Sequence, residues 1–351
     1  MDICIYLKKT EPEVTFNSAE HIIPAGIGGI RKLNYGTVCD QVNTGIFSNI
    51  EKDFMRNSII SIPRQFYGPG KRGSLSPQNA SKSKVHVMTQ KDEVDEVSLG
   101  YIKLGKPHQI PQFKINKDKE MIMIFDLYDG DYNEQLNIFI NKLGDFDGQY
   151  ILINDKKFLK DEIIVGFYEN RWYVASYKEI DKIELEKIIK AIAKKEFEIK
   201  GSPIEQITHI TSHQKMGFKI DYYFRVCAKI AFNYLAHCKG TGFVLQNKFD
   251  PIREWIVNGG ENIYVKMIDK SKETPSPLEY LNFPEESHKV FILKSGKCLI
   301  SYIGFYGNNF DTVICLCDNF DEHFNLDAYI CDWKNRQEYT LNEYLHINRQ
   351  D

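Results

Sequence analysis

The spacing of hydrophobic residues predicts three helices in the chain. Residues 43–54 have the spacing of a helix with one apolar face. The apolar positions on that face are Ile46, Phe47, Ile50 and Phe54. Residues 181–197 repeat the pattern, with isoleucine and leucine on one side and lysine and glutamate on the other. Residues 222–237 are apolar enough to form a buried helix.

Shorter apolar runs, rich in β-branched and aromatic residues, predict strands. They cover residues 121–127, 150–154, 163–167, 171–177, 290–293, 297–305 and 312–316. Two of these runs are separated by only three residues and indicate a hairpin, and the last three suggest a terminal antiparallel sheet. Helices mixed with short strands in this way indicate an α+β fold.

The composition is that of a globular protein of about two domains. A chain of 351 residues with 42% hydrophobic residues can bury a substantial core. The sequence opens with no basic and apolar leader, and no apolar run reaches the roughly twenty residues of a membrane span. We therefore expect a cytoplasmic protein with no membrane partner. Its eight cysteines are too few for a disulfide scaffold and suit a reducing compartment.

Positive charge is concentrated near the start of the chain. The formal net charge is −3, yet residues 1–85 hold eleven Lys and Arg against seven Asp and Glu. A stretch rich in Gly, Pro and Ser contains cations but no acid, and these cations are Arg56, Arg64, Lys71, Arg72, Lys82 and Lys84. Two interpretations stay open: a solvated linker, and an arm that contacts the phosphate backbone of nucleic acid.

The residues most suited to chemistry lie before residue 45. Glu20 and His21 are adjacent within residues 18–29, which read Ser-Ala-Glu-His-Ile-Ile-Pro-Ala-Gly-Ile-Gly-Gly. A carboxylate offers a hard oxygen ligand, and an imidazole can take a proton near neutral pH. The proline and glycines predict a loop between two strands. The predicted helix begins at Asn43, and it can pack on this hairpin and bring Asn43 towards Glu20 and His21.

Residues 4–56 resemble the HNH endonuclease family, in the branch with a Glu-His-Ile-Ile-Pro core and a Cys-x-x-Cys-Asn second half. The resemblance implies an N-terminal ββα-metal unit in which His21 is the general base that activates water against a phosphodiester. It also implies that Glu20 and Asn43 hold one divalent metal, Mg²⁺ or Mn²⁺, and that Asn34 orients the loop. The expected products carry 5′-phosphate and 3′-hydroxyl ends.

The sequence departs from the family at its zinc knuckles. Each of the two Cys-x-x-Cys pairs has lost its second cysteine, leaving Cys4 with Leu7 and Cys39 with Val42. Two thiols cannot complete a tetrahedral zinc site. We therefore expect no structural zinc, with Leu7 and Val42 forming a small apolar plug beside two buried thiols.

Several of these residues also have a purely structural interpretation. An isolated histidine is more often structural than catalytic, so the case for His21 depends on the surrounding pattern. Asn43 would also serve well as a helix N-cap. Arg225, Lys229 and Arg253 could contact nucleic acid, but a buried helix and a capped turn explain them adequately.

We therefore predict three parts. Residues 1–60 form an HNH ββα-metal nuclease domain, residues 61–95 a basic linker or arm, and residues 96–351 a larger mixed α+β accessory domain that senses a signal or binds a partner or nucleic acid. The predicted function is divalent-metal-dependent phosphodiester hydrolysis, of DNA in the first instance, in bacterial defence against phage or foreign DNA.

Alternatives to this function stay open. One is a catalytically degenerate HNH-shaped module that binds nucleic acid or a protein, and another is a nuclease that cuts RNA. For assembly, a homo-oligomer and a sensor partner such as a short Argonaute are both open.

Overall fold

The chain folds into two compact units. The computed structural model describes residues 2–90, 97–116, 120–126, 130–154, 159, 162–177, 181–194, 210–269, 283–307 and 310–347. Unit 1 comprises Met1–Ser81 together with Met216–Asp351, and unit 2 comprises Lys82–Lys215. Unit 2 is therefore inserted in sequence between the two halves of unit 1.

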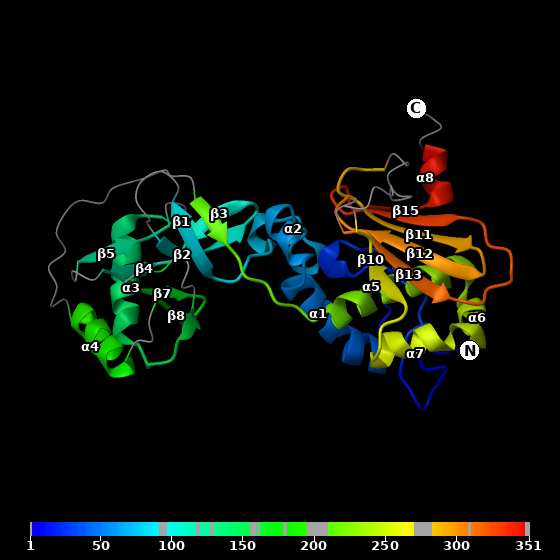
Figure 1. Ribbon diagram of the computed structural model, residues 1–351, viewed down its shortest axis with the longest axis horizontal. Coiled ribbons are helices and arrows are strands. Elements are labelled where there is room, and N and C mark those ends of the chain that lie inside the picture. The colour runs from blue at the N-terminus through cyan, green and yellow to red at the C-terminus, as the bar shows by residue number, and fades with distance from the viewer. Residues whose placement is uncertain are drawn as a thin grey trace. The chain divides into compact units, whose positions relative to one another are not determined.

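Unit 1 is built on a six-stranded antiparallel sheet, whose strands run from yellow (β10) to orange in Figure 1. In spatial order its strands are β10 (Val265–Met267), β13 (Thr312–Cys317), β12 (Cys298–Gly304), β11 (His288–Ser295), β14 (Asp327–Asp332) and β15 (Gln337–Thr340). Alternate residues on β12 and β13 are buried, as expected for strands with one face against a core. The buried set includes Leu299, Ile303, Ile314 and Leu316.

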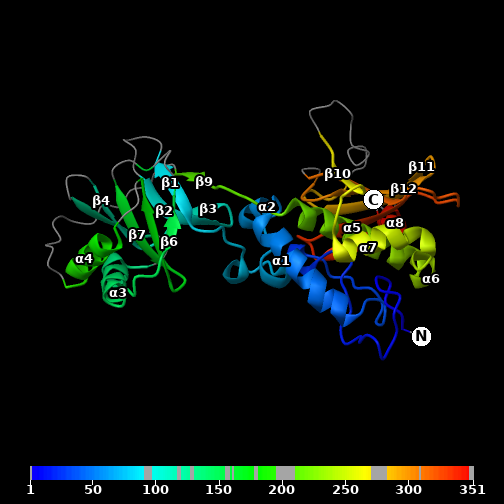
Figure 2. The same cartoon turned by 60° about the horizontal axis from the view of Figure 1, so that its bottom comes forward.

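A long buried helix, α5 (Ile220–Lys239), covers one face of this sheet. Figure 1 and Figure 2 show α5 and α7 (Asp250–Asn258) side by side against the strands. Most of α5 is buried because α1 (Ser48–Asn57) packs on it as well. Gly240, at a φ of 84°, ends α5 by taking a conformation that favours glycine. The remaining helical segments are α2 (Ser61–Phe66), α6 (Thr241–Val244), α8 (Leu341–Ile347), η1 (Ala25–Ile27), η2 (Gln41–Phe47), η3 (Lys71–Gly73), η4 (Pro77–Asn79) and η5 (Asn247–Phe249).

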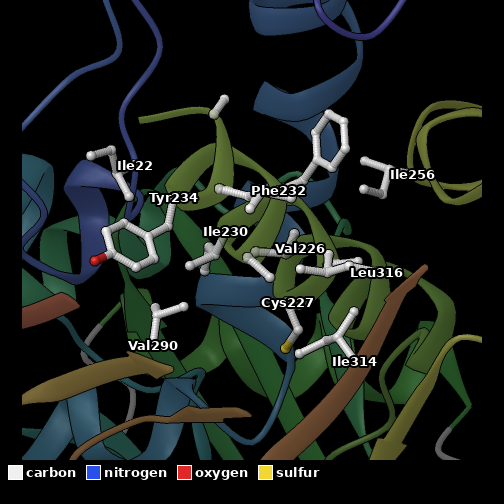
Figure 3. Close-up of a cluster of buried hydrophobic side chains, with 14 of the residues drawn as sticks. Ile22, Val226, Cys227, Ile230, Phe232, Tyr234, Ile256, Val290, Ile314 and Leu316 are labelled. Carbon is white, nitrogen blue, oxygen red and sulfur yellow. The ribbon is translucent and has the colours of Figure 1, made fainter. Parts of the chain in front are cut away.

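The core of unit 1 joins the beginning and the end of the chain. Figure 3 shows Ile22, from the N-terminal part, in the same cluster as Val226 and Ile230 of α5 and Ile314 of β13. The predicted apolar face of residues 43–54 belongs to this core, with Phe47, Ile50 and Phe54 buried. The first sixty residues therefore use α5 and the sheet to bury their apolar side chains.

In its described residues, unit 2 contains two packed sheets and two helices. The first sheet has the order β3 (Lys106–Gln109), β2 (Val97–Lys103), β1 (His86–Gln90), β9 (Ile210–His213), and the second has the order β5 (Met121–Ile124), β4 (Gln112–Ile115), β7 (Ile163–Tyr168), β8 (Arg171–Ser176), β6 (Ile151–Ile153). Ile164 packs towards the first sheet, and its neighbour Val165 packs towards helices α3 (Tyr132–Gly144) and α4 (Lys182–Ala193). The second sheet therefore lies between the first sheet and the helices.

The mixed α+β class is confirmed, as are the helices predicted within residues 43–54, 181–197 and 222–237 and the strands predicted after residue 120, as far as the structure describes these residues. The expected N-terminal ββα unit is not confirmed, because the described residues before β1 form no strand and only an isolated bridge joins His21 to Lys32. The predicted domain boundaries are not those that the contacts give. Residues 1–60 do not have a core of their own, since their apolar side chains pack on α5, and the expected accessory region of residues 96–351 is divided between the two units. The expected linker contains α2, β1 and two short helical turns.

In the part of the chain that the structure describes, no helix is both long enough and apolar enough to cross a membrane.

Candidate functional site

The expected acid and base lie on a short hairpin near the start of unit 1. The amide of Leu33 donates to the carbonyl of Glu20 at 2.8 Å, and the amide of Ile22 donates to the carbonyl of Arg31 at 3.1 Å. His21 pairs with Lys32 between these bonds. Consecutive residues in extended backbone point to opposite faces, and the side chain of Glu20 is buried while that of His21 is partly exposed.

Glycines allow the loop of this hairpin to fold back on itself. Gly28 has a φ of 101°, and a Cβ atom at Gly29 would lie only 1.8 Å from the carbonyl oxygen of Ile23. Neither position accepts a side chain without moving the backbone. The glycine pair therefore fixes the path of the chain directly after His21.

The helical segment that follows begins before Asn43. Asn43 is the third residue of η2, so it is not an N-cap. Its Nδ2 atom donates to Oγ of Ser18 at 3.1 Å, and Ser18 in turn donates to Asp40 at 2.9 Å. Asp40 also accepts hydrogen bonds from Thr15 and Asn17. Asn43 thus belongs to a polar network that holds the start of the helix against residues 15–18.

Glu20 binds a buried lysine. Nζ of Lys229, on α5, forms an ion pair with Glu20 and a second one with Oε1 of Glu51 at 2.6 Å. The same ammonium donates to the backbone carbonyl of His21 at 3.3 Å. The side chain of Lys229 has no exposed surface, so these three oxygen atoms replace the water molecules that would hydrate its ammonium group in solution.

The carboxylates keep Lys229 charged. Burial alone would lower the pKa of Lys229, but Glu20 and Glu51 outweigh burial and the pKa is raised above its usual value of 10.5. Burial raises the pKa of Glu20, with the ammonium of Lys229 acting in the other direction. With both carboxyl groups ionised, the three side chains together hold two negative charges and one positive charge. They connect the hairpin, α1 and α5.

His21 has a fixed backbone and a neutral imidazole. Burial, followed by the positive charges of Lys32 and Lys229, lowers the pKa of His21 to about 4, so the imidazole is neutral at pH 7. Nδ2 of Asn233 holds the backbone carbonyl of His21 at 3.0 Å. Among the residues that the structure describes, none forms a hydrogen bond with the imidazole. The backbone of His21 is fixed and its ring nitrogens are free to bind a proton.

The expected metal ligands have other partners in this conformation. Glu20 is paired with Lys229, whereas Asn43 binds Ser18, and no hydrogen bond joins Glu20 to Asn43. No group of three or more His, Cys, Asp or Glu side chains placed to hold a metal ion is found within the described residues. Glu51, on α1, pairs with the same lysine as Glu20, which is Lys229. The pair of Glu20 and Asn43 therefore does not fit a divalent ion as it stands.

Asn34, the fourth expected site residue, lies in a turn. It is exposed, and its backbone carbonyl accepts the amide of Thr37 at 3.2 Å. It follows Leu33, whose amide binds Glu20. This placement supports a role in loop geometry.

The six cations of the expected arm differ in exposure. Arg56, Lys71, Arg72 and Lys84 are exposed. Arg64 is buried, and the expectation that it binds nucleic acid is wrong for this conformation, because its guanidinium donates to the carbonyls of Met55 at 2.8 Å and Gly70 at 3.3 Å. Lys82 is exposed as well, and its ammonium forms an ion pair with Glu169 at 3.2 Å.

The basic residues singled out in the second half of the chain are all buried. Arg225 donates to the carbonyl of Ile256 at 2.9 Å, and Arg253 pairs with Asp250. Lys229 belongs to the ion pairs with Glu20 and Glu51. The structural interpretation of these three residues is therefore the correct one.

The remnants of the zinc knuckles lie in the core. Cys4, Cys39 and Val42 are fully buried, and Leu7 packs against the same cluster. The amide of Cys39 donates to Sγ of Cys4 at 3.4 Å. Hydrogen bonds from the thiol of Cys39 and from nearby backbone amides lower the pKa of Cys4 to about 6, although burial acts in the other direction. This packing agrees with the expected plug, and the absence of zinc stays a prediction.

The sequence patterns did not predict the ion pairs of Glu20. Glu51 was not among the predicted site residues, and Lys229 was interpreted either as part of a buried helix or as a contact to nucleic acid. One signal was present: Lys229 stands in an apolar run of α5, and a lysine in a buried helix needs acidic partners.

Comparisons with known proteins give no relatives for this chain. No family model matches it, and no curated protein or solved structure does so either.

Proposed function

We propose that the chain is an HNH-type endonuclease that hydrolyses phosphodiester bonds, of DNA in the first instance, with His21 as general base. The observation that carries this proposal is the state of His21, whose backbone is held by Asn233 and Lys229 while its neutral imidazole has no hydrogen-bond partner in the described part of the chain. The resemblance of residues 4–56 to the HNH family supports the role of general base for this imidazole.

The base chemistry requires a neutral imidazole beside water. His21 would take a proton from a water molecule as the water oxygen attacks phosphorus, the bond from phosphorus to the 3′ oxygen would break, and the departing 3′ oxygen would take a proton from solvent to become the 3′-hydroxyl. Because the pKa of His21 is lowered to about 4, almost all of the protein carries the reactive neutral form at pH 7. The products would carry 5′-phosphate and 3′-hydroxyl ends.

Dependence on Mg²⁺ or Mn²⁺ is part of the proposal. A bound divalent ion would stabilise the charge that develops on the phosphate. We assign it no step, since Glu20 is paired with Lys229 and Asn43 with Ser18 in this conformation.

Exposed cations of unit 1 support a nucleic-acid substrate. Arg56, Lys71 and Arg72 are exposed and belong to the same unit as His21. Such side chains add affinity for phosphate without reading sequence. Within the proposal, the protein is cytoplasmic, acts in defence against foreign DNA, and assembles with itself or with a sensor partner such as a short Argonaute.

The test is incubation of the purified protein with supercoiled plasmid, linear duplex DNA, single-stranded DNA and RNA, each with Mg²⁺, with Mn²⁺ and with chelator. We expect nicked and then linear plasmid in the presence of metal and intact plasmid with chelator. Cleavage of RNA alone would establish the RNA-cutting alternative. Intact substrates under every condition would contradict the proposal.

A second candidate is a catalytically degenerate module that binds nucleic acid or a protein. The ion pair of Glu20 with Lys229 favours it, because the carboxylate expected to hold metal already has a cation. Binding of the same substrates with no cleavage at any metal concentration would identify this second function.

A further inference from the structure

Three oxygen atoms from two separate segments surround the ammonium of Lys229. They are carboxylate oxygens of Glu20 and Glu51, the latter at 2.6 Å, and the carbonyl oxygen of His21 at 3.3 Å. The side chain of Lys229 is 0% exposed. An ammonium group has three N–H donors, so this oxygen cage satisfies it fully.

The same cage has the chemistry of a site for a hard divalent cation. Carboxylate and backbone carbonyl oxygens are the ligands that Mg²⁺, Mn²⁺ and Ca²⁺ prefer. Two carboxylates around one ammonium leave a net charge of one negative unit, whereas a divalent ion would balance the two carboxylates. The cage already holds a cation, which is the ammonium of Lys229.

We infer that Glu20, Glu51 and the carbonyl of His21 form a cation site, that Lys229 fills it as an internal cation, and that the lysine must withdraw before a divalent ion binds there. This inference rests on the proposed function only in that both assign Glu20 to the metal. In the inferred site the second side chain that binds the metal is Glu51. Asn43, which the resemblance implied for this role, binds Ser18 instead.

Lys229 is a strong competitor because it is part of the same molecule. It is anchored on α5, whose neighbouring residues are buried, so its ammonium is present at the cage at a high effective concentration. A divalent ion entering beside it would also meet an adjacent positive charge. The wild-type protein should therefore bind Mn²⁺ weakly at this position.

The test measures Mn²⁺ binding to the full chain without nucleic acid. Calorimetry and electron paramagnetic resonance give the affinity and the number of ions bound. In Lys229→Met the ammonium is lost and the length of the side chain is largely kept. We expect this variant to bind one Mn²⁺ per chain at least tenfold more tightly than the wild-type protein. Adding Glu51→Gln to it should remove most of that gain.

A matched control is Lys114→Met in unit 2. Lys114 is also a buried lysine paired with a glutamate, since its Nζ lies 3.6 Å from Glu162. Its removal should leave Mn²⁺ binding unchanged. A similar gain in Lys114→Met would overturn the inference, because the effect would then come from the loss of any buried lysine.

The inference can also be tested if Lys229→Met is unstable. The variant leaves two buried carboxylates close together, so Mn²⁺ should raise its Tm by several degrees more than it raises the Tm of the wild-type protein. Equal Mn²⁺ affinity in both proteins, or a variant that Mn²⁺ neither binds nor stabilises, would overturn the inference.

Cleavage assays separate this inference from the proposed nuclease. If Lys229→Met gains Mn²⁺ but neither protein cuts nucleic acid, the cation site stands and the nuclease fails. If the wild-type protein cuts and Lys229→Met gains no Mn²⁺, the nuclease stands and the cation site fails.

Discussion

Nδ2 of Asn233 donates a hydrogen bond to the backbone carbonyl of His21 at 3.0 Å, across 212 positions of sequence. Oδ1 of the same asparagine accepts a hydrogen bond from the hydroxyl of Tyr6 at 2.7 Å. Asn233 is fully buried, so both ends of its amide are used inside the core. α5 thereby holds the hairpin that carries the candidate base.

Replacing Asn233 by Ala should destabilise the protein. The substitution removes one hydrogen bond from the carbonyl of His21, which keeps its bond from Lys229, and one from the hydroxyl of Tyr6, and each lost bond costs about 0.5 to 1.5 kcal/mol. Denaturant unfolding measures the loss. Asn258→Ala, at an exposed position on α7, is the control and should change stability by less than about 0.5 kcal/mol. Equal stability of the two variants would show that the Asn233 bonds do not stabilise the fold.

Acid should destabilise the protein through His288. This buried imidazole lies 2.9 Å from the carbonyl of Ile27 and accepts the amide of Tyr306 at 3.2 Å, an arrangement that fits the neutral ring. Burial lowers the pKa of His288 from 6.5 to about 3. Below pH 6.5 the imidazole of His288 binds a proton in the unfolded chain but stays neutral in the folded protein. Its contribution to stability is therefore complete above pH 6.5 and is lost as the pH falls towards 3.

The loss can be measured as unfolding free energy against pH. A pKa difference of one unit corresponds to about 1.4 kcal/mol, so His288 alone should remove a few kcal/mol by pH 4. His21, with a pKa of about 4, contributes in the same direction. His288→Asn should show a shallower decline between pH 6.5 and 4. An identical decline would mean that other groups govern the acid sensitivity.

Metal analysis should find no stoichiometric zinc in the wild-type protein. Val42 is buried beside Cys39, and Leu7 packs on the same core, where two further thiolates would be needed. Restoring both cysteines, in a Leu7→Cys and Val42→Cys double variant, should create a site for one zinc ion per chain. A full equivalent of zinc in the wild-type protein would show that other residues complete the site.

The exposed cations should add affinity for nucleic acid and no chemistry. In a triple variant, Arg56→Ser and Lys71→Ser are combined with Arg72→Asn, since residue 72 has a φ of 53° and asparagine tolerates this conformation. The slope of log affinity against log salt should flatten by about 0.9 for each lost phosphate contact on duplex DNA. Turnover at saturating substrate should stay unchanged.

A control for the triple variant removes exposed lysines from the sheet. Lys266→Ser with Lys297→Ser changes the net charge without touching the segment after α1. If this double variant flattens the salt slope as much as the triple variant does, the effect reflects overall charge and the proposed contacts are wrong.

Local periodicity predicted α1, α4 and α5 and about half of the described strands, because each of these depends on residues close in sequence. The apolar face of residues 43–54 and the hairpin of β7 and β8 are examples. It missed other elements, such as α3, α7, β1 and β2. The division into units could not be predicted in this way. It depends on contacts such as those of Ile22 and Phe54 with α5, between residues about two hundred positions apart.

The candidate site was predicted only in part for the same reason. Motif spacing identified His21 and Glu20, but the partners of Glu20 come from α1 and α5, which no local pattern connects. Arg64 shows the opposite error, since a cation in a stretch rich in Gly and Pro was expected at the surface. It is buried because two backbone carbonyls accept its guanidinium.

The most direct test of the proposed nuclease is the cleavage rate of His21→Ala on plasmid DNA with Mg²⁺ or Mn²⁺. Removal of a general base lowers a rate by about 10² to 10⁴, and we expect a loss in this range with the fold and nucleic-acid binding preserved. His346→Ala, at an exposed histidine of α8, is the matched control and should cut at the wild-type rate. Undiminished cleavage by folded His21→Ala would contradict the assignment of His21 as the base.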